Sequence, residues 1–157
     1  LEQVRNRMYQ NFAEERTTWL FIDEVQSLFK HPAVIAYFES FWAEGRKFGL
    51  VATGLSQNAS FMLGSDIGST MILNSDYLML HKQSTMDRAL WAETLNLSDE
   101  EIGYIDDGIK PGDGLLVAGG ARLPITNELP KGRIYDLLTT KPSEVAALGG
   151  AGMRSAR

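Results

Sequence analysis

Apolar residues recur at helical spacing at the start of the chain and then change to short continuous runs. Apolar side chains at positions 1, 4, 8 and 12 are separated by polar ones, which predicts an amphipathic helix over residues 1–15. Residues 19–22 form a brief run rich in strand formers, which predicts a strand. A strand without polar positions is typical of a sheet buried on both faces.

Helical periodicity and short apolar runs continue to alternate further along the chain. A helix is predicted over residues 32–44, with Pro32 in its first turn and Gly45 at its end. Residues 54–70 are predicted as loop and short helix, and residues 86–95 as a helix. The remaining predicted strands cover residues 48–53, 76–81, 114–118, 121–126 and 134–139.

Local signals fix two further features. Ser98 followed by three acidic residues, the last of them Glu101, matches the capping box of a helix N-terminus. Gly119 and Gly120 lie between two predicted strands and indicate a two-residue hairpin turn. From Lys141 the chain becomes Ala, Gly, Ser and Arg with little to bury, so residues 141–157 are predicted as a disordered tail.

The order of these elements predicts the fold class. Strands that alternate with helices are typical of an α/β protein with a mainly parallel sheet flanked by helices, here finished by a C-terminal antiparallel hairpin. The chain has 157 residues, of which 44% are hydrophobic, enough for a single domain over residues 1–140.

Composition narrows the chemistry. The 15 basic and 20 acidic residues give a net charge of −5, which argues against a nucleic-acid coat protein. No cysteine is present, which excludes disulfides, cysteine zinc sites and thiol nucleophiles; the 2 histidines, His31 and His81, are too few for a multi-histidine metal centre and are expected to be structural. No run spans a membrane and no signal peptide is visible. Because the chain begins with a charged helical stretch and no initiator Met, we expect a piece of a longer protein.

Two acidic residues follow the first predicted strand directly. Parallel sheets bind ligands beyond the carboxyl ends of their strands, where Asp23 and Glu24 lie. In nucleotide hydrolases this is the Walker B arrangement, in which the Asp orders Mg²⁺ through water and the Glu polarises the attacking water. The alternative is a strand that ends in charged residues because it reaches solvent, and the two interpretations have about equal weight on these residues alone.

The second predicted strand adds an amide. Gln57 follows it and is placed to sense a phosphate or hold the attacking water; its alternative is a loop side chain facing solvent. Residues 49–56 have the Gly and Ser spacing of a P-loop, but Leu55 stands where the lysine must be, so this stretch is rejected. A nucleotide site here needs a phosphate-binding loop from upstream sequence.

Four cations are candidates for phosphate or subunit contacts. Arg46 and Lys47 follow the C-terminal end of the helix predicted over residues 32–44. They interact favourably there with the negative end of the helix dipole or, alternatively, supply an arginine finger to a neighbouring subunit. Lys82 and Arg88 flank the exit of the third predicted strand as second-rank candidates. The aromatic residues Trp19, Phe38, Phe41 and Trp42 fit core positions rather than a base-stacking platform.

Several of these segments together resemble one family. Residues 18–24, 45–49 and 53–58 are similar to the C-terminal half of the VirB-type ATPases of conjugative transfer and type IV secretion. The same order is kept by residues 80–83, 97–101, 112–116 and 135–140, so the resemblance covers about residues 11–144.

The resemblance implies a partial RecA-like P-loop NTPase domain that works as a homo-hexamer with ATP and Mg²⁺ at subunit interfaces. By position, Asp23 and Glu24 match the Walker B pair, with Asp23 as the metal-associated residue. Gln57 matches the sensor glutamine, and Arg46 and Lys47 match the basic motif near the interface. Ser56 stands where many relatives have Thr and keeps the hydroxyl.

Further expectations concern partners and place. The implied partners are the missing N-terminal half of the ATPase domain, other secretion-channel components, and a DNA or protein substrate. The implied location is the cytoplasm of a bacterium, at the inner face of the membrane. Without the P-loop half, this chain alone is expected not to hydrolyse ATP. Two other readings stay open: a non-enzymatic interaction module on an α/β scaffold, and a receiver-type domain with Asp23 as phosphoacceptor.

Overall fold

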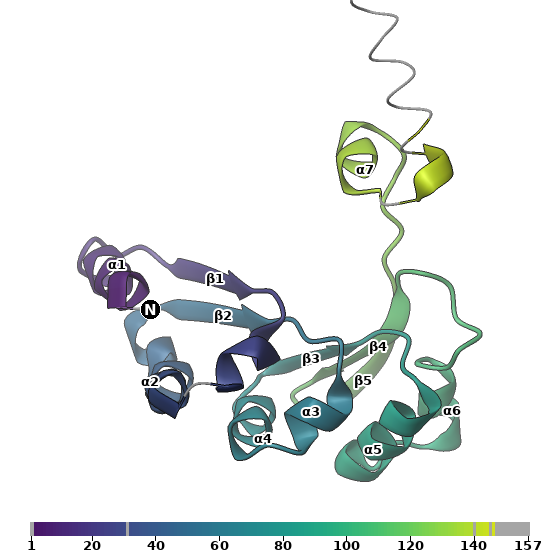
Figure 1. Ribbon diagram of the computed structural model, residues 1–157, viewed down its shortest axis with the longest axis horizontal. Coiled ribbons are helices and arrows are strands. Elements are labelled where there is room, and N and C mark those ends of the chain that lie inside the picture. The colour runs from purple at the N-terminus through teal and green to yellow at the C-terminus, as the bar shows by residue number, and fades with distance from the viewer. Residues whose placement is uncertain (1, 31, 140, 145, 147–157) are drawn as a thin grey trace, which may run out of the picture.

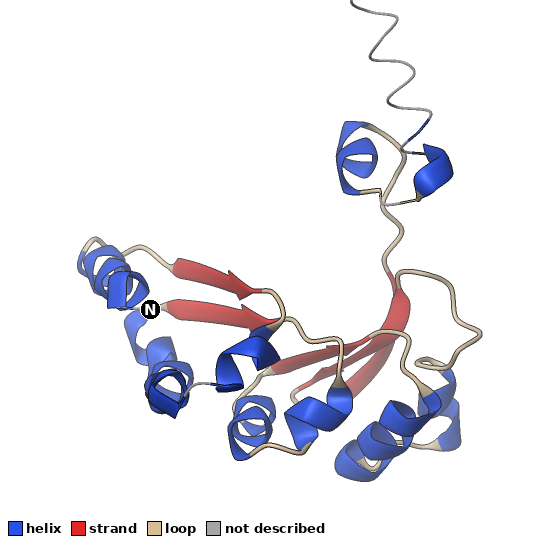
Figure 2. Ribbon diagram, in the orientation of Figure 1, coloured by secondary structure: helices blue, strands red, loops and turns tan. Residues whose placement is uncertain are grey.

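The computed structural model describes residues 2–30, 32–139, 141–144 and 146, in helices and strands that alternate along the chain (Figures 1 and 2). The first part contains α1 (Glu2–Ala13), β1 (Thr18–Ile22), η1 (Val25–Lys30), α2 (Pro32–Glu44), η2 (Gly45–Phe48) and β2 (Leu50–Gly54). The second part contains α3 (Ala59–Leu63), α4 (Asp66–Leu73), β3 (Tyr77–Leu80), α5 (Thr85–Leu95), α6 (Asp99–Gly103), β4 (Asp113–Ala118), β5 (Ala121–Thr126) and α7 (Arg133–Leu138).

The strands form two sheets. β1 and β2 run parallel, in a register that places Thr18 beside Leu50 and Ile22 beside Gly54. β3, β4 and β5 form an antiparallel sheet in that order. The α/β class and the C-terminal hairpin are confirmed.

The pairing of β3 differs from the expected mainly parallel sheet. Of the five strands in the described residues, β1 and β2 form the one parallel pair, and β3 joins the hairpin instead. The reason lies in packing, because Leu80 of β3 pairs with Leu115 of β4, and both are buried against Trp91 and Ile105. At the hairpin tip Gly119 and Gly120 have φ of 53° and 93°, values that glycine adopts without strain.

Helices cover one face of the strands. Figure 1 shows α2 to α6 gathered on the same side of the two sheets. Under them lie three apolar clusters, centred on Phe38 and Val25, on Ile105 and Leu115, and on Met8. Phe38, Phe41 and Trp42 pack in these clusters as predicted.

The opposite face of the parallel pair is uncovered within the described residues. Trp19 and Phe21 stack on one another there and are 63% and 67% exposed, beside Val51 of β2. The predictions that this strand is buried on both faces and that Trp19 is a core residue are therefore wrong for the described structure. Alternation explains the pattern, since Leu20 and Ile22 face the helices while Trp19 and Phe21 face away. We call Trp19, Phe21 and Val51 the exposed sheet face.

Sequence signals for helix ends are confirmed around α6. The Ser98 side chain accepts from the backbone N–H of Glu101, and the Glu101 carboxylate accepts from the backbone N–H of Ser98 at 2.8 Å. That backbone hydrogen bond and the nearby Arg122 hold the pKa of Glu101 below its ordinary value.

The prediction of a last strand over residues 134–139 is wrong, because residues 134–138 lie in α7 and not in a sheet. The helix satisfies its backbone locally, with the N–H of Thr139 donating to the carbonyl of Tyr135 at 2.8 Å. The predicted tail from Lys141 lies mostly outside the described residues. Within it Glu144 accepts hydrogen bonds from Thr139 and then Tyr135, which lower its pKa. No helix in the described part of the chain is both long and apolar enough to cross a bilayer.

Candidate functional site

The carboxyl ends of β1 and β2 are tied together by their backbones. The N–H of Leu55 donates to the carbonyl of Ile22 at 2.8 Å, and the N–H of Val25 donates to the carbonyl of Leu55 at 3.0 Å. Between these two bonds lie Asp23 and Glu24, at the turn where β1 leads into η1. The Val25 side chain is fully buried in the core, which anchors the turn.

Glu24 adopts an unusual backbone conformation at this turn. Its φ is 50°, in the left-handed region that residues other than glycine adopt rarely. The Oδ1 atom of Asp23 accepts the Glu24 N–H at 2.9 Å, and the Glu24 carbonyl accepts the N–H of Ser27 at 2.8 Å. Both backbone groups of Glu24 are thus bonded although the residue continues neither the strand nor the helix.

Two amides hold the Glu24 carboxylate. Nε2 of Gln57, from the segment after β2, donates to one carboxylate oxygen, and Nε2 of Gln26, from η1, donates to the other. The structure therefore brings together Glu24 and Gln57, which were predicted from sequence to lie at neighbouring strand ends. Sequence reasoning missed Gln26, because a polar residue in a short helix carries no signal of its own.

Gln26 is only half satisfied. Its Nε2 donates to Glu24, whereas its Oε1 is buried without a hydrogen-bond partner. A buried acceptor left without a partner costs about 1–3 kcal/mol. The opposite amide orientation would place Oε1 against the Glu24 carboxylate oxygen, so the assigned orientation is the favourable one.

Within the described ranges this acid pair has no cationic partner. Among the residues that the structure describes, no Lys or Arg forms an ion pair with Asp23 or Glu24. The donors to Glu24 are uncharged amides, and each carboxylate oxygen has a second acceptor position. The cluster can therefore orient a carboxylate and leave its negative charge available to accept a proton.

Asp23 fits a metal held by water and phosphate better than a protein cage. Its side chain is exposed, and no group of three or more acidic or histidine side chains suited to a metal ion occurs in the described ranges. Mg²⁺ in nucleotide sites is usually held by one or two carboxylates, several waters and the phosphates. A single exposed carboxylate at a strand end agrees with that donor set.

Arg46 and Lys47 lie at the other end of β2. Both belong to η2, which precedes the strand, while Gln57 follows it. A strand of five residues is roughly 16 Å long. Arg46 is 83% exposed and pairs with Asp76, with 3.5 Å between Nη1 and Oδ1. The structure does not bring these two cations to Glu24 of the same chain.

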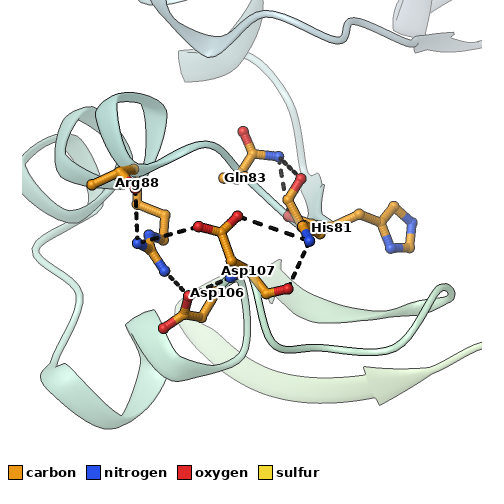
Figure 3. A network of polar contacts seen from close by, with 7 residues as sticks. His81, Gln83, Arg88, Asp106 and Asp107 are labelled. Atoms are coloured by element: carbon orange, nitrogen blue, oxygen red, sulfur yellow. Dashed lines mark hydrogen bonds and ion pairs between the residues drawn. The ribbon is translucent and has the colours of Figure 1, made fainter.

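Arg88, Asp106 and Asp107 belong to a separate polar network (Figure 3), in which Lys82 also takes part. Arg88 pairs with Asp106 and, at 3.9 Å, with Asp107. Lys82 donates from Nζ to the carbonyl of Asp107 at 2.6 Å. The backbone N–H of Asp107 and, after it, the Arg88 guanidinium hold the pKa of Asp106 below its ordinary value. We call Lys82, Arg88, Asp106 and Asp107 the paired network.

The structure also shows where the P-loop look-alike and His81 lie. The P-loop look-alike over residues 49–56 runs through β2, so it is a strand and not a phosphate loop. His81 places Nδ1 at 3.0 Å from the carbonyl of Asp113, consistent with the structural role expected of it. The corresponding expectation for His31 lies outside the described residues.

Comparison with known proteins finds a similarity among solved structures. No protein-family model and no curated protein matches the sequence. Among solved structures, VirB4 of Thermoanaerobacter pseudethanolicus matches 82% of this chain with a TM-score of 0.65 and 27% identity. The match covers 32% of the VirB4 chain, so this chain spans about a third of that protein. In sequence and in three-dimensional structure, the chain is thus similar to one part of VirB4.

Proposed function

We propose that this chain supplies the water-activating acid and the sensor amide of an ATP-hydrolysing site in a type IV secretion ATPase. The observation that carries the proposal is the Glu24 carboxylate, held at the end of β1 by two uncharged amides. The similarity to VirB4 supports the class of protein. The remaining parts of the site come from sequence upstream of this chain, including the phosphate-binding loop with its lysine.

Glu24 is the general base in this proposal. A base must accept a proton from a water beside the phosphate, and a carboxylate paired with a cation accepts it poorly. Gln57 and Gln26 orient the carboxylate without neutralising it. Gln57 also lies on the exposed side of the cluster, where its carbonyl is suited to the attacking water or to a phosphate-bound group.

Asp23 holds the metal side of the site. Its Oδ1 is oriented by the Glu24 N–H at 2.9 Å, and a water of Mg²⁺ is the group it would bind. Mg²⁺, when bound with ATP, supplies neutralisation of charge on the phosphate oxygens.

Arg46 and Lys47 act on a neighbouring subunit in this proposal. They lie at the opposite end of β2 from Gln57, and the exposed Arg46 side chain reaches outward to Asp76. A homo-hexamer, with each nucleotide between two subunits, would bring such an arginine to the next site as an arginine finger. Lys82 and Arg88 are weaker candidates for nucleotide contact, because their partners in the chain are already acids.

The exposed sheet face gives the proposal a place for the rest of the domain. Parallel strands are normally covered on both faces, whereas Trp19 and Phe21 are 63% and 67% exposed here. We propose that the upstream half of the same polypeptide covers this face and brings the phosphate loop to Glu24. Other secretion-channel components and a DNA or protein substrate are the partners of the assembled protein, at the cytoplasmic face of the membrane.

The two other readings have less support. A receiver-type domain needs an acidic cluster around its phosphoacceptor, and the described residues contain no such group beside Asp23. An interaction module would use the exposed sheet face but gives no reason for an acid held by two amides.

The proposal is tested by Glu24→Gln in the complete polypeptide. We expect ATP turnover to fall by about a hundredfold or more, because the general base is lost while the shape of the side chain is kept. Glu93→Gln, at an exposed position of α5, is the matched control and should leave turnover unchanged. A decrease of less than about tenfold for Glu24→Gln would show that the assigned base is wrong.

A further inference from the structure

The proposed site assigns roles to an acid pair and a sensor amide but none to Gln26, although Gln26 contacts the acid directly. It resides in η1, two residues after Glu24, and its Nε2 donates to the carboxylate oxygen that Gln57 leaves free. The two amides come from different segments, one after β1 and one after β2. Their hydrogen bonds therefore restrict rotation of the carboxylate from two directions.

The backbone around Gln26 gives it little freedom. Val25, directly before it, is fully buried and bonded through its N–H to Leu55 at 3.0 Å. Ser27, directly after it, donates its N–H to the carbonyl of Glu24 at 2.8 Å. The amide of Gln26 is thus presented to Glu24 from a fixed turn, whereas Gln57 is exposed and lies in a loop.

The chemistry of Gln26 also restricts what can replace it. Its Oε1 is buried without a hydrogen-bond partner, so its contact with Glu24 is the polar interaction that fixes the amide. A lysine here would neutralise the carboxylate, and a glutamate would repel it. A shorter asparagine would not reach the same oxygen from the same turn.

We infer that Gln26 is a positioning residue, which holds the Glu24 carboxylate in the orientation that accepts a proton from the attacking water. This inference rests on the proposed function of Glu24. Gln26 itself touches neither nucleotide nor water in this assignment. Its contribution is to keep one carboxylate oxygen bound, so that the pair of amides sets the plane of the carboxylate.

The test is a double-mutant cycle of Gln26→Met and Glu24→Gln in the complete polypeptide. Methionine keeps the length of the side chain and removes the donor. We expect Gln26→Met alone to lower kcat for ATP by about tenfold with KM for ATP unchanged, because only the orientation of the base is lost. In the Glu24→Gln background the same substitution should change kcat less than about twofold.

The cycle separates the inference from the proposed function. If Glu24→Gln lowers kcat but Gln26→Met does not, or if the two effects multiply, the positioning role is wrong and the function of Glu24 stands. If Glu24→Gln leaves kcat unchanged, the proposed function is wrong.

Folding is controlled separately. Ser27→Ala, at an exposed neighbouring position, should match the parent in kcat and KM. If Gln26→Met loses binding of a non-hydrolysable ATP analogue, Gln26→Asn replaces it, with the same expected decrease in kcat. Full activity of a folded Gln26→Asn variant would overturn the inference, because the shorter side chain cannot make the contact.

Discussion

The two clusters of acidic residues in this chain are built in opposite ways. In the paired network Arg88 and Lys82 are the partners of Asp106 and Asp107, so each acid contacts a cation. At the end of β1, Glu24 is held by the amides of Gln26 and Gln57, and no described cation pairs with it. One cluster orients its carboxylates by neutralising them, and the other orients a carboxylate and keeps its charge.

This difference distinguishes acidic residues that stabilise the fold from an acidic residue that can take part in proton transfer. The paired network connects β3, α5 and the turn after α6, and its Arg88 side chain is only 16% exposed. Its charged side chains pair with one another and so hold those segments together. Around Glu24 the segments are held by backbone hydrogen bonds of Val25 and Leu55, and no basic residue in the part of the chain that the structure describes pairs with the carboxylate. Acids oriented by neutral donors are therefore the better candidates for proton transfer.

The largest expected effect comes from giving the Glu24 cluster a cation, as the paired network has. Gln57→Lys places a cation against Glu24, and we expect ATP turnover of the complete polypeptide to fall by about a hundredfold, because a neutralised carboxylate is a poor base. Gln57→Met removes the amide without adding charge and should lower turnover by only about tenfold. Steady-state hydrolysis measures both. Equal losses in the two variants would mean that the charge of Glu24 is unimportant.

A smaller effect is expected when the paired network loses its central cation. Arg88→Met leaves Asp106 and Asp107 without their partly buried partner and should lower the free energy of unfolding by about 1–2 kcal/mol. Lys82→Met, at a side chain that is 55% exposed, should lower it by about 0.5 kcal/mol or less. Urea unfolding at neutral pH measures both. A large loss of ATP turnover with unchanged stability in Arg88→Met would place this network in the site instead.

The smallest effect is a pH dependence of the same network. The pKa of Asp106 is held below its ordinary value of 3.8 by the backbone N–H of Asp107 and then by Arg88. A lowered pKa in the folded state contributes stability above the ordinary pKa, which is lost as the pH falls through the lower folded value. Stability should therefore decline below about pH 4, and the difference between the parent and Arg88→Met should narrow there. Urea midpoints between pH 7 and pH 2 measure it, and a difference that widens on acidification would contradict the assigned partners.

Local signals made much of the fold predictable. The capping box at Ser98 and the hairpin turn at Gly119 and Gly120 depend on residues close in sequence, and both are confirmed. The pairing of β3 depends on Leu80 meeting Leu115, which are far apart in the chain, and no local pattern carries it. Residues 134–139 contain strand formers, but a strand needs a neighbour, and α7 satisfies its own backbone instead.

The candidate site divides in the same way. The placement of Glu24 near Gln57 follows from a general rule, because adjacent parallel strands end at the same edge of a sheet. The contact of Gln26 with Glu24 was not predictable, because it depends on the left-handed backbone turn at Glu24. A φ of 50° is not expected of a glutamate from the sequence. The separation of Arg46 from Glu24 could be predicted from the sequence, because Arg46 precedes β2 whereas Gln57 follows it.

The exposed sheet face contains Trp19, whose fluorescence depends on whether this face is covered. Of the 3 tryptophans in the chain, Trp91 is 7% exposed and Trp42 packs in a core cluster, while Trp19 is 63% exposed. Its indole therefore emits from an aqueous environment, and the other two do so from apolar ones. Any polypeptide that comes to lie over β1 will shift that emission to shorter wavelength and shield it from iodide. The fluorescence of Trp19 therefore reports directly whether another polypeptide covers this face of the sheet.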